Sequence, residues 1–278
     1  MKTMKRGLAL VLVLLLALSA MSALAAEKEI AINSKNFPDE TFRSYVQKKF
    51  DTNKDNKLSA AEINKATLID VSEKKAIKNL KGIQYFTALK RLYCSETSIT
   101  TLDLSKNTNL TEVGVGETPL SSLKLGKLKK LHSLEATDTK LKKLDISGCD
   151  KLMSYVKGYY YIEDGCVTWA GGQDAFISVS TSTKLMNGSK VLRQYAKPKS
   201  IKFSKSSLSL KKNKDYDLFT ILKFTPSTSY YKLKFSSDKS SIVEVDSTDG
   251  MAYAKKKGTA TVTVTCGGQT AKIKVTVK

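Results

Sequence analysis

The chain repeats itself with a period of 21 residues. Three consecutive segments between residues 89 and 151 each begin with leucine, at Leu89, Leu110 and Leu131. Four more apolar positions return at the same interval: Leu92, Val113 and Leu134; Ile99, Leu120 and Leu141; Leu102, Leu123 and Leu144; Leu104, Leu125 and Ile146. One segment cannot bury its apolar residues alone, so the pattern predicts a solenoid of stacked coils with these side chains inside. A fourth coil is predicted from three residues in phase: Leu152, Tyr155 and Ile162.

The motifs LxxLxCxxxxI and LxxLDLSxN in these segments resemble those of a leucine-rich repeat protein. The resemblance implies a mainly β solenoid over 67–157 with a helical N-terminal cap. Ser105 and Asn107 occupy the place where such repeats bury a polar ladder, which Leu128 interrupts in the second copy. An irregular first coil over 67–89 is expected to turn these residues inward: Ile69, Val71, Ile77, Leu80, Ile83 and Phe86.

Residues 51–62, DTNKDNKLSAAE, place oxygen-bearing side chains at alternating positions. A helix is expected before this loop, starting near Pro38, and a short helix after it. Helix, twelve-residue loop and helix resemble an EF-hand, which binds Ca²⁺. The resemblance implies a cap over 27–66 and these ligands: Asp51, Asn53, Asp55, the backbone carbonyl of Lys57, Ser59, and Glu62 as the bidentate ligand. Asn56 stands where glycine is usual, which weakens the turn without forbidding it.

The same loop permits a metal-free interpretation. Ser59 and Glu62 have the spacing of a capping box at the start of the second helix. Capping does not account for Asp51, Asn53 or Asp55, so the pattern favours calcium. Its expected role is structural, fixing the helical cap on the first coil.

From about residue 198 the pattern changes to short strands that alternate apolar and polar residues. Turn signals such as Asp249-Gly250 and Gly267-Gly268 separate them, which predicts an all-β sandwich over 198–278. The pieces IKF, LSL, FSSD, SIVEVD and KKGTATVTV resemble the group 2 bacterial immunoglobulin-like domain. That resemblance implies a surface module used as a spacer, a stalk or an adhesive unit. Phe235 stands where the family often has tryptophan.

Between these parts, residues 158–197 are assigned to a C-terminal cap and linker. This segment is rich in aromatic residues: Tyr159, Tyr160, Tyr161 and Trp169. They are expected to form a capping core, and a platform for sugars is the alternative. The fold class is therefore multidomain, with a short leucine-rich repeat solenoid followed by an immunoglobulin-like sandwich.

The first 25 residues have the pattern of a secretory signal peptide. A basic start precedes the apolar run from Gly7 to Leu18, and Ala23 and Ala25 provide small residues for cleavage after Ala25. No later run is long enough to span a bilayer, and the C-terminal end shows no sorting motif. The sequence therefore predicts a secreted or cell-surface protein.

The formal net charge is +21, and removing Lys2, Lys5 and Arg6 leaves +18. Outside a cell such a charge favours a polyanion as partner, such as an anionic cell-wall polymer (teichoic acid), an acidic polysaccharide or a membrane surface, and a merely solvated surface is the alternative. No nucleic-acid partner is expected, and the sequence gives no oligomeric state. Cys149 and Cys166 are the pair to test for a disulfide, and Cys94 is expected in the core.

Catalytic patterns are weak, so the chain is predicted not to be an enzyme. His132 is the single histidine, and repetition alone explains Asp103 and Asp145 at equivalent positions. A carbohydrate-active enzyme that uses this carboxylate pair is kept as an alternative.

The function predicted instead is non-enzymatic binding or adhesion, in which the solenoid recognises an extracellular protein or glycan and the sandwich is a spacer. Variable residues beside the inward leucines form the candidate partner surface: Arg91, Tyr93, Glu112, Ser133 and Glu135. A second ladder, with Asp103, Lys124 and Asp145, lies on the opposite half of each coil, and the sequence does not decide between the two. A structural cell-wall protein held by positive charge is a further alternative.

Overall fold

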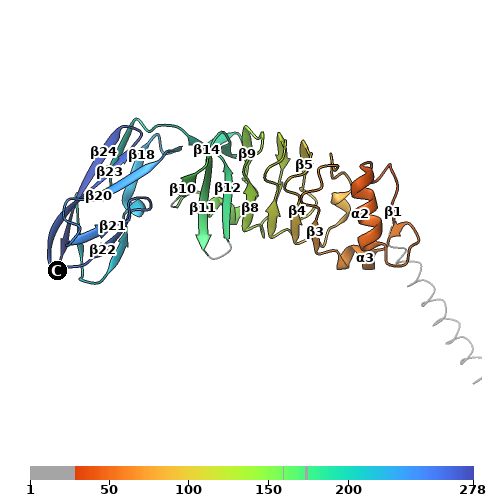
Figure 1. Ribbon diagram of the computed structural model, residues 1–278, viewed down its shortest axis with the longest axis horizontal. Helices are drawn as coiled ribbons and strands as arrows, with labels where there is room; N and C mark the ends of the chain where they lie inside the picture. Colours follow the sequence, from red (N-terminus) through yellow and green to blue (C-terminus); the bar gives the residue numbers. More distant parts are fainter. Residues whose placement is uncertain (1–28, 159, 173–174) are drawn as a thin grey trace, which may run out of the picture.

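A computed structural model describes residues 29–158, 160–172 and 175–278. The signal peptide predicted over 1–25 and Tyr159 lie outside the described residues. The molecule is elongated, with a helical cap at one end, stacked short strands in the middle and a separate β domain at the other end (Figure 1). Among the described residues, no helix has the length and hydropathy needed to cross a membrane.

The N-terminal cap contains helix α2 (Glu40–Phe50) and the short helix α3 (Ala60–Lys65). Helix α2 begins after Asp39, whose side chain accepts a hydrogen bond from the Phe42 N–H at 3.0 Å. The helix buries one apolar face: Phe42, Val46 and Phe50. Between the helices, strand β2 (Lys57–Leu58) pairs antiparallel with β1 (Ile30–Ala31) and ties the loop to the start of the described chain.

The cap sits tightly on the first coil. Gly82 adopts φ +108°, and a Cβ placed there would lie 2.2 Å from the ring of Phe37. The second carboxylate oxygen of Asp39 accepts from the backbone N–H of Lys78 at 2.8 Å, so this side chain both caps α2 and holds the cap to the coil. Phe86 of the first coil contacts Phe37 and Phe50, with ring centroids 6.4 and 5.2 Å away.

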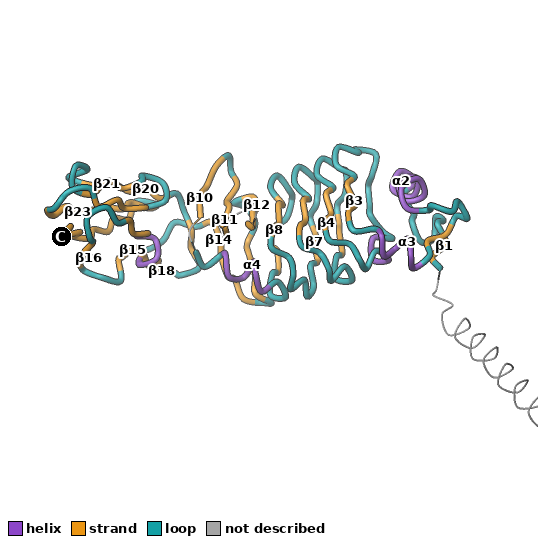
Figure 2. The backbone as a smooth tube through the Cα atoms, turned by 90° about the horizontal axis from the view of Figure 1, so that it is seen from below, coloured by secondary structure: helices purple, strands orange, loops and turns teal. Residues whose placement is uncertain are grey.

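One parallel strand per repeat builds a continuous sheet (Figure 2). The strands are β3 (Leu68–Asp70), β4 (Arg91–Tyr93), β6 (Glu112–Gly114) and β8 (Ser133–Ala136). Arg91 pairs with Glu112, and Glu112 with Ser133, so the register advances by one 21-residue repeat at each step. The other half of each coil carries a second set of short strands: β5 (Thr101–Asp103), β7 (Ser122–Lys124) and β9 (Lys143–Asp145).

The recurring apolar residues form the core between these two sides. Leu89, Leu110 and Leu131 have no exposed surface, and the other four positions are buried in all three repeats. Asn107 is also fully buried, where its amide donates to the carbonyls of Ile83 and Phe86 at 2.8 and 3.0 Å. Leu128 and Cys149 are buried at the equivalent places in the next coils. The polar ladder is therefore interrupted as predicted, and Ser105, which is only half-buried, takes no part in it.

The prediction of a fourth coil with the same geometry was wrong. Helix α4 (Asp150–Tyr155) stands where the fourth strand was expected, and Tyr155 and Ile162 are only partly buried. The neighbour of β8 is instead β12 (Ala175–Ser180), which pairs with it in parallel, Ile177 opposite Leu134. Asp150 lies in the first turn of this helix, where the helix dipole favours a carboxylate.

The segment after α4 extends both sides of the stack. On one side, β11 (Cys166–Gly172) and β10 (Tyr160–Glu163) add antiparallel to β12, which gives the sheet order β10-β11-β12-β8-β6-β4-β3. On the other, β13 (Lys184–Asn187) pairs in parallel with β9 and antiparallel with β14 (Lys190–Tyr195). The segment assigned to a cap and linker is therefore largely paired strand.

The C-terminal domain is built from strands, as predicted. One sheet has the order β16-β24-β23-β20, and another has β17-β22-β21, with β15 and β18 as a separate pair. The bounds are β15 (Ser200–Phe203), β16 (Ser207–Leu210), β17 (Asp215–Asp217), β18 (Leu222–Thr225), β19 (Ser229–Tyr230), β20 (Leu233–Ser237), β21 (Val243–Val245), β22 (Met251–Ala254), β23 (Gly258–Cys266) and β24 (Gln269–Val277). Gly267 and Gly268 form the β23–β24 turn with φ +59° and +89°, a conformation that glycine adopts without strain. Phe235 is buried in this core.

An aromatic cluster joins the repeat region to the C-terminal domain. Trp169 is fully buried, and its ring lies 5.1 Å from that of Tyr230 and 6.1 Å from that of Tyr160. The Tyr160 hydroxyl donates to the Tyr231 carbonyl at 2.8 Å, and β14 pairs with β19 (Ser229–Tyr230) across the same junction. Because Trp169 and Tyr160 are core residues, the alternative of a sugar platform made from them was wrong.

All four cysteines are free thiols. The Cys149–Cys166 disulfide suggested by the sequence is therefore not formed. Cys94, Cys149 and Cys266 are buried, and burial raises the pKa of the Cys149 and Cys266 thiols to about 11. Cys94 behaves as the predicted small core residue.

Candidate functional site

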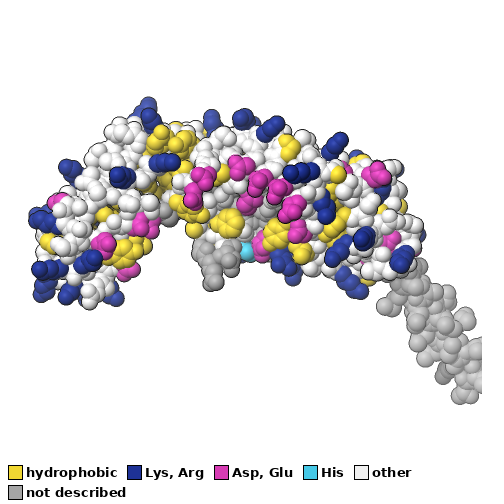
Figure 3. Space-filling model, in the orientation of Figure 1, with side chains coloured by type: hydrophobic (Ala, Val, Ile, Leu, Met, Phe, Trp, Pro, Cys, Tyr) yellow, Lys and Arg dark blue, Asp and Glu magenta, His cyan; other side chains and the backbone are white. Residues whose placement is uncertain are grey.

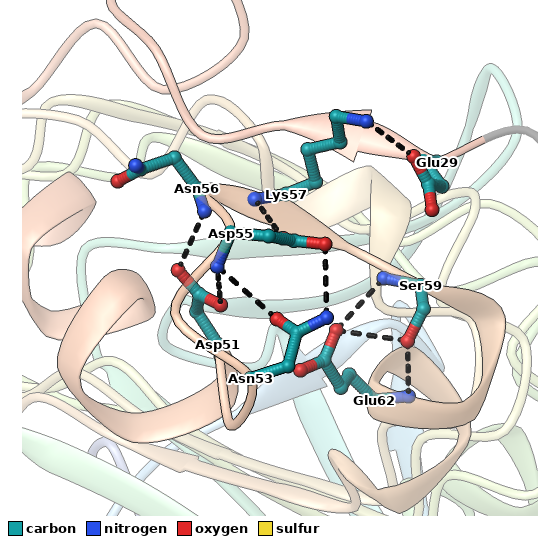
Figure 4. Close-up of polar contacts among 8 residues, drawn as sticks. All are labelled: Glu29, Asp51, Asn53, Asp55, Asn56, Lys57, Ser59 and Glu62. Atoms are coloured by element: carbon teal, nitrogen blue, oxygen red, sulfur yellow. Dashed lines mark hydrogen bonds and ion pairs between the residues drawn. The ribbon is translucent and has the colours of Figure 1, made fainter.

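The loop that follows α2 organises its own oxygen-bearing side chains. The Asp51 carboxylate accepts from the backbone N–H groups of Asp55 and Asn56 at 3.1 and 3.0 Å (Figure 4). Asp55 accepts from the backbone N–H of Lys57 at 2.8 Å and from the Asn53 amide at 2.9 Å. Asn56 has φ +61°, the left-handed conformation that the usual glycine would adopt there. Asparagine meets this requirement because it tolerates that region better than most residues.

Glu62 makes the capping box that the sequence offered as the metal-free alternative. One carboxylate oxygen accepts from the Ser59 N–H and hydroxyl at 2.9 and 2.8 Å. The other accepts from the Thr52 N–H and hydroxyl at 2.7 and 2.8 Å. Burial acts to raise the pKa of Glu62, but the hydrogen bonds from Ser59 and Thr52 outweigh it and lower the pKa to about 2.

The donor set of the loop suits calcium in its chemistry, since Asp, Asn, Ser and Glu oxygens are the ligands that this ion prefers. In the described parts of the chain, however, no three Asp, Glu, His or Cys side chains converge in an arrangement that could hold a metal ion. Glu62 is also engaged elsewhere: its two oxygens have about four acceptor sites, and four donors occupy them. A bidentate Glu62 would have to release Thr52 or Ser59.

The five residues predicted as a partner surface lie together on the outward face of three neighbouring strands. Arg91, Glu112 and Ser133 occupy one row across β4, β6 and β8, and Tyr93 and Glu135 occupy the next row with Gly114 between them. Arg91 is exposed, and the other four are half-buried. All of them except Arg91 border a shallow hollow of about 600 Å³.

Hydrogen bonds hold this face in place. The Tyr93 hydroxyl donates to the Glu112 carboxylate, and burial together with this carboxylate raises the pKa of Tyr93. Glu135 accepts from the Gly116 N–H at 2.9 Å and from the Thr137 N–H at 2.8 Å. The carboxylates of Glu112 and Glu135, which border the hollow, are therefore held by groups of neighbouring coils.

Sequence reasoning missed four residues that border the same hollow: Asp70, Ser72, Ser95 and Phe176. Asp70 was hidden because the first coil is two residues longer than the others, which moves it out of the 21-residue phase. Phe176 lies on β12, opposite Ser133 but 43 residues later, where no repeat signal remains. Ser95 carried no signal beyond its place two residues after Tyr93.

The residues considered for catalysis have structural contacts. Asp103 makes an ion pair with Lys124 at 2.9 Å. Burial acts to raise the pKa of Asp103, but hydrogen bonds from Ser105 and Lys124 outweigh it and lower the pKa to about 2. Asp145 accepts from the N–H groups of Ser147 and Gly188 at 3.0 and 2.9 Å. This second ladder therefore ties coils to one another.

Comparison with known proteins identifies the C-terminal domain. Residues 198–277 match the model of the bacterial Ig-like domain (group 2), which agrees with the resemblance found in the sequence. A stretch of 72 residues, 26% of this chain, is 36% identical to Internalin J of Listeria monocytogenes serotype 4b (strain F2365). The match spans 8% of that relative, so it relates only a small part of the two proteins.

Solved structures of similar proteins include further internalins. A secreted internalin-like protein from Listeria monocytogenes is 11% identical with a TM-score of 0.32, over 90% of this chain and 98% of that one. An internalin (inlF) from Listeria monocytogenes is 20% identical with a TM-score of 0.26, over 44% of this chain and 53% of that one. These TM-scores are too low to relate the folds.

Proposed function

We propose that this chain is a secreted or cell-surface protein that acts by binding and not by catalysis. The repeat region is a leucine-rich repeat solenoid in this proposal, and the bacterial Ig-like domain is its spacer. The repeating core, the parallel register and the stretch of 36% identity to Internalin J support the assignment. An extracellular protein is the partner class that the surface chemistry supports best.

The recognition surface in this proposal is the outward face of the sheet around Tyr93, Glu112 and Glu135. The single observation that carries it is the pre-ordered hollow on this face, whose polar groups come from different coils and are fixed by hydrogen bonds. Fixed side chains lose little conformational freedom when a partner binds. The half-buried rings of Tyr93 and Phe176 add apolar area of the kind that anchors protein interfaces.

Charge supports a protein with a basic surface as the partner of this face. The four strand segments with their following turns (68–73, 91–96, 112–117 and 133–138) hold seven acidic residues and one arginine, a net charge of −6 in a chain of +21. Acidic side chains gather over the middle of the molecule in Figure 3, and lysines lie around them and on the C-terminal domain. An anionic polymer would be repelled from this face.

A structural role at an anionic cell wall is the second candidate, and a different region favours it. Residues 198–278 contain sixteen lysines and six acidic residues, a net charge of +10. Attraction of this kind is screened by salt over about 10 Å at 0.1 M ionic strength. Wall binding through the Ig-like domain is therefore expected to disappear at moderate salt, whereas binding through the ordered sheet face is expected to persist.

We also propose that the loop over residues 51–62 binds calcium as a structural ion. The left-handed Asn56 and the row of Asp51, Asn53 and Asp55 support this. These residues with Ser59, Glu62 and the Lys57 carbonyl would hold the ion, which would neutralise the carboxylates. Isothermal titration of calcium into the full chain is expected to show one site that Glu62→Gln weakens at least tenfold. Equal titrations for the two proteins would contradict this.

A capture experiment tests the main proposal. Immobilised wild-type chain, Glu135→Lys and the control Asp103→Lys are incubated with host mucus and with isolated cell walls, with calcium and with chelator. The proposal expects a mucus protein that wild type and Asp103→Lys retain and that Glu135→Lys loses. Equal retention by all three variants would contradict it, and release of reducing sugars from a polysaccharide panel would favour an enzyme.

A further inference from the structure

The seven-stranded sheet is covered at one end and has an unpaired edge strand at the other. At one end the cap covers β3, where the Tyr45 hydroxyl accepts a hydrogen bond from the Asp70 N–H at 3.3 Å. At the other end β10 pairs only with β11, and no described strand pairs with its outer side. Figure 1 places β10 where the repeat region meets the strands of the Ig-like domain. This end of the sheet is therefore an open edge in the middle of the molecule.

The backbone of β10 has groups directed away from its partner. Strands β10 and β11 are joined by the two-residue turn of Asp164 and Gly165, with φ +45° and +76°. In such a hairpin the residues that flank the turn, Glu163 and Cys166, exchange hydrogen bonds, and bonded pairs then alternate with unbonded ones. The N–H and C=O of Ile162 therefore point outward. They can be satisfied by one residue of an added strand or by water.

A hollow of about 450 Å³ lies along this edge. Its near wall is β10 itself, and its far wall is formed by Lys232, Leu233 and Thr248 of the Ig-like domain. The Tyr160 hydroxyl fixes the far wall, since it donates to the Tyr231 carbonyl at 2.8 Å and accepts from the Tyr231 N–H at 2.9 Å. Figure 3 shows a notch in the outline between the two parts, beside hydrophobic side chains.

Strand β10 is short and carries Glu163, but it lacks lysine, proline and bulges, three of the features that protect a sheet edge. Lysine, proline and bulges discourage other strands from pairing with an edge, and the sequence YYIE of β10 contains neither residue. Tyr161 is 45% exposed. Glu163 and Asp164 are also exposed, and neither carboxylate has an ion-pair partner among the described residues.

We propose that β10 is a docking edge for an extended peptide segment of another protein, which adds as a new strand in the hollow between the sheet and the Ig-like domain. Main-chain bonds to Ile162 would set the register of the peptide. Tyr161 and Leu233 would accept an apolar side chain, and the charge of Glu163 and Asp164 favours a basic residue beside it. This site is separate from the sheet face proposed above.

The dimensions favour a single extended chain as the occupant. The volume of about 450 Å³ is in the range of small-ligand sites, about 300–1,000 Å³, so it admits a few residues of an extended chain but no folded domain. A second copy of this chain would have to pair with β10 through the edge of a complete sheet. The fixed far wall of the hollow leaves no room for a sheet there. A sugar would stack on an exposed ring, and among the residues that line the hollow Tyr161 is such a ring, but stacking on it would leave the N–H and C=O of Ile162 without partners.

Selection from a library of random ten-residue peptides displayed on phage, with the full chain as bait, tests the proposal. Selected peptides are then synthesised with single N-methyl groups and titrated against wild type, Tyr161→Ala and Tyr253→Ala. Tyr253 is the matched control, because it is 44% exposed on a strand of the Ig-like domain outside the hollow. Thermal unfolding of both variants checks that each is folded.

The proposal expects N-methylation to weaken binding about three- to tenfold at alternate peptide positions and little between them, because each blocked position loses one hydrogen bond. Tyr161→Ala is expected to weaken binding about tenfold, and Tyr253→Ala to leave it unchanged. Failure to enrich any peptide would overturn the proposal, as would peptides that bind Tyr161→Ala and wild type equally. Binding to a glycan array that depends on Tyr161 would assign the hollow to carbohydrate instead.

Discussion

The two ends of the repeat region are closed in different ways. At the N-terminal end, a separate helical cap rests on the first coil through a phenylalanine cluster and through Asp39. At the C-terminal end the sheet continues into β12, β11 and β10, and the aromatic cluster around Trp169 joins it to the next domain. The first end is a lid that packs on the first coil. The second is a joint that makes the Ig-like domain a continuation of the stack.

The largest effect is expected at this joint. Replacing Trp169 with alanine removes a fully buried ring from between Tyr160 and Tyr230, and such truncations cost about 3–5 kcal/mol. Because the cluster belongs to both parts, hydrogen exchange is expected to rise in the last coil and also in β19 and β20. Urea denaturation gives the size of the loss, and exchange measured by mass spectrometry gives its extent.

Phe37→Ala is the matched change at the lid. Phe37 is equally buried, and its loss is expected to raise hydrogen exchange in α2 and the first coil while the Ig-like domain stays unchanged. If both variants loosened the same residues, the distinction between lid and joint would be wrong.

The next largest effect is expected for Asp39→Ala. This change removes the cap of α2 and leaves the backbone N–H of Lys78 without its acceptor in a partly buried place. The two losses together are expected to destabilise the lid by about 2 kcal/mol, which urea denaturation can measure. Asp103→Ala is the control, since its ion pair with Lys124 is exposed and worth about 1 kcal/mol or less.

Glu62→Gln without calcium is expected to cost about 1 kcal/mol through the weakened capping box. The loss should depend on pH. Since the folded-state pKa is lowered from 4.5 to about 2, the carboxylate contributes fully above pH 4.5, and its contribution disappears as pH falls through about 2. The difference between wild type and variant is therefore expected to shrink over that window. A difference that grows with acidity would contradict the bonding described for Glu62.

The smallest effect on stability is expected for Tyr93→Phe, which removes only the hydroxyl that bonds Glu112 on a half-buried surface. Thermal unfolding is expected to show a loss below about 1 kcal/mol. Binding of the captured partner should fall by more than stability does, because the change frees Glu112 in the hollow. A stability loss above that of Asp39→Ala would mean that this face supports the fold.

Regular periodicity explains which parts of the fold could be predicted from the sequence. The pattern repeats in the leucine positions over 89–151 and in the alternating strands after residue 198. Many residues therefore support the same structural prediction. The segment after Ser147 could not be predicted in the same way. There the buried neighbour of Leu134 is Ile177, 43 residues later, and only tertiary packing decides that β12 rather than the next segment fills that place.

In the candidate sites, too, the residues that follow the repeat could be predicted and those brought in by tertiary packing could not. The row Arg91, Glu112, Ser133 follows directly from the repeat, whereas Phe176 joins the hollow only through the folded sheet. In the loop, spacing suggested both a calcium site and a capping box. The capping box is present, and whether calcium displaces Thr52 or Ser59 from Glu62 depends on free energies that spacing does not contain.

Hydroxyl-radical footprinting of the full chain tests the central claim that the outward sheet face is the recognition surface. Oxidation of tyrosines is measured with and without the mucus or wall fraction that the chain retains. We expect protection of Tyr93 on β4 and no change at Tyr253 on the Ig-like domain. Protection of Tyr253 with Tyr93 still fully oxidised would place recognition on the basic domain and contradict the account.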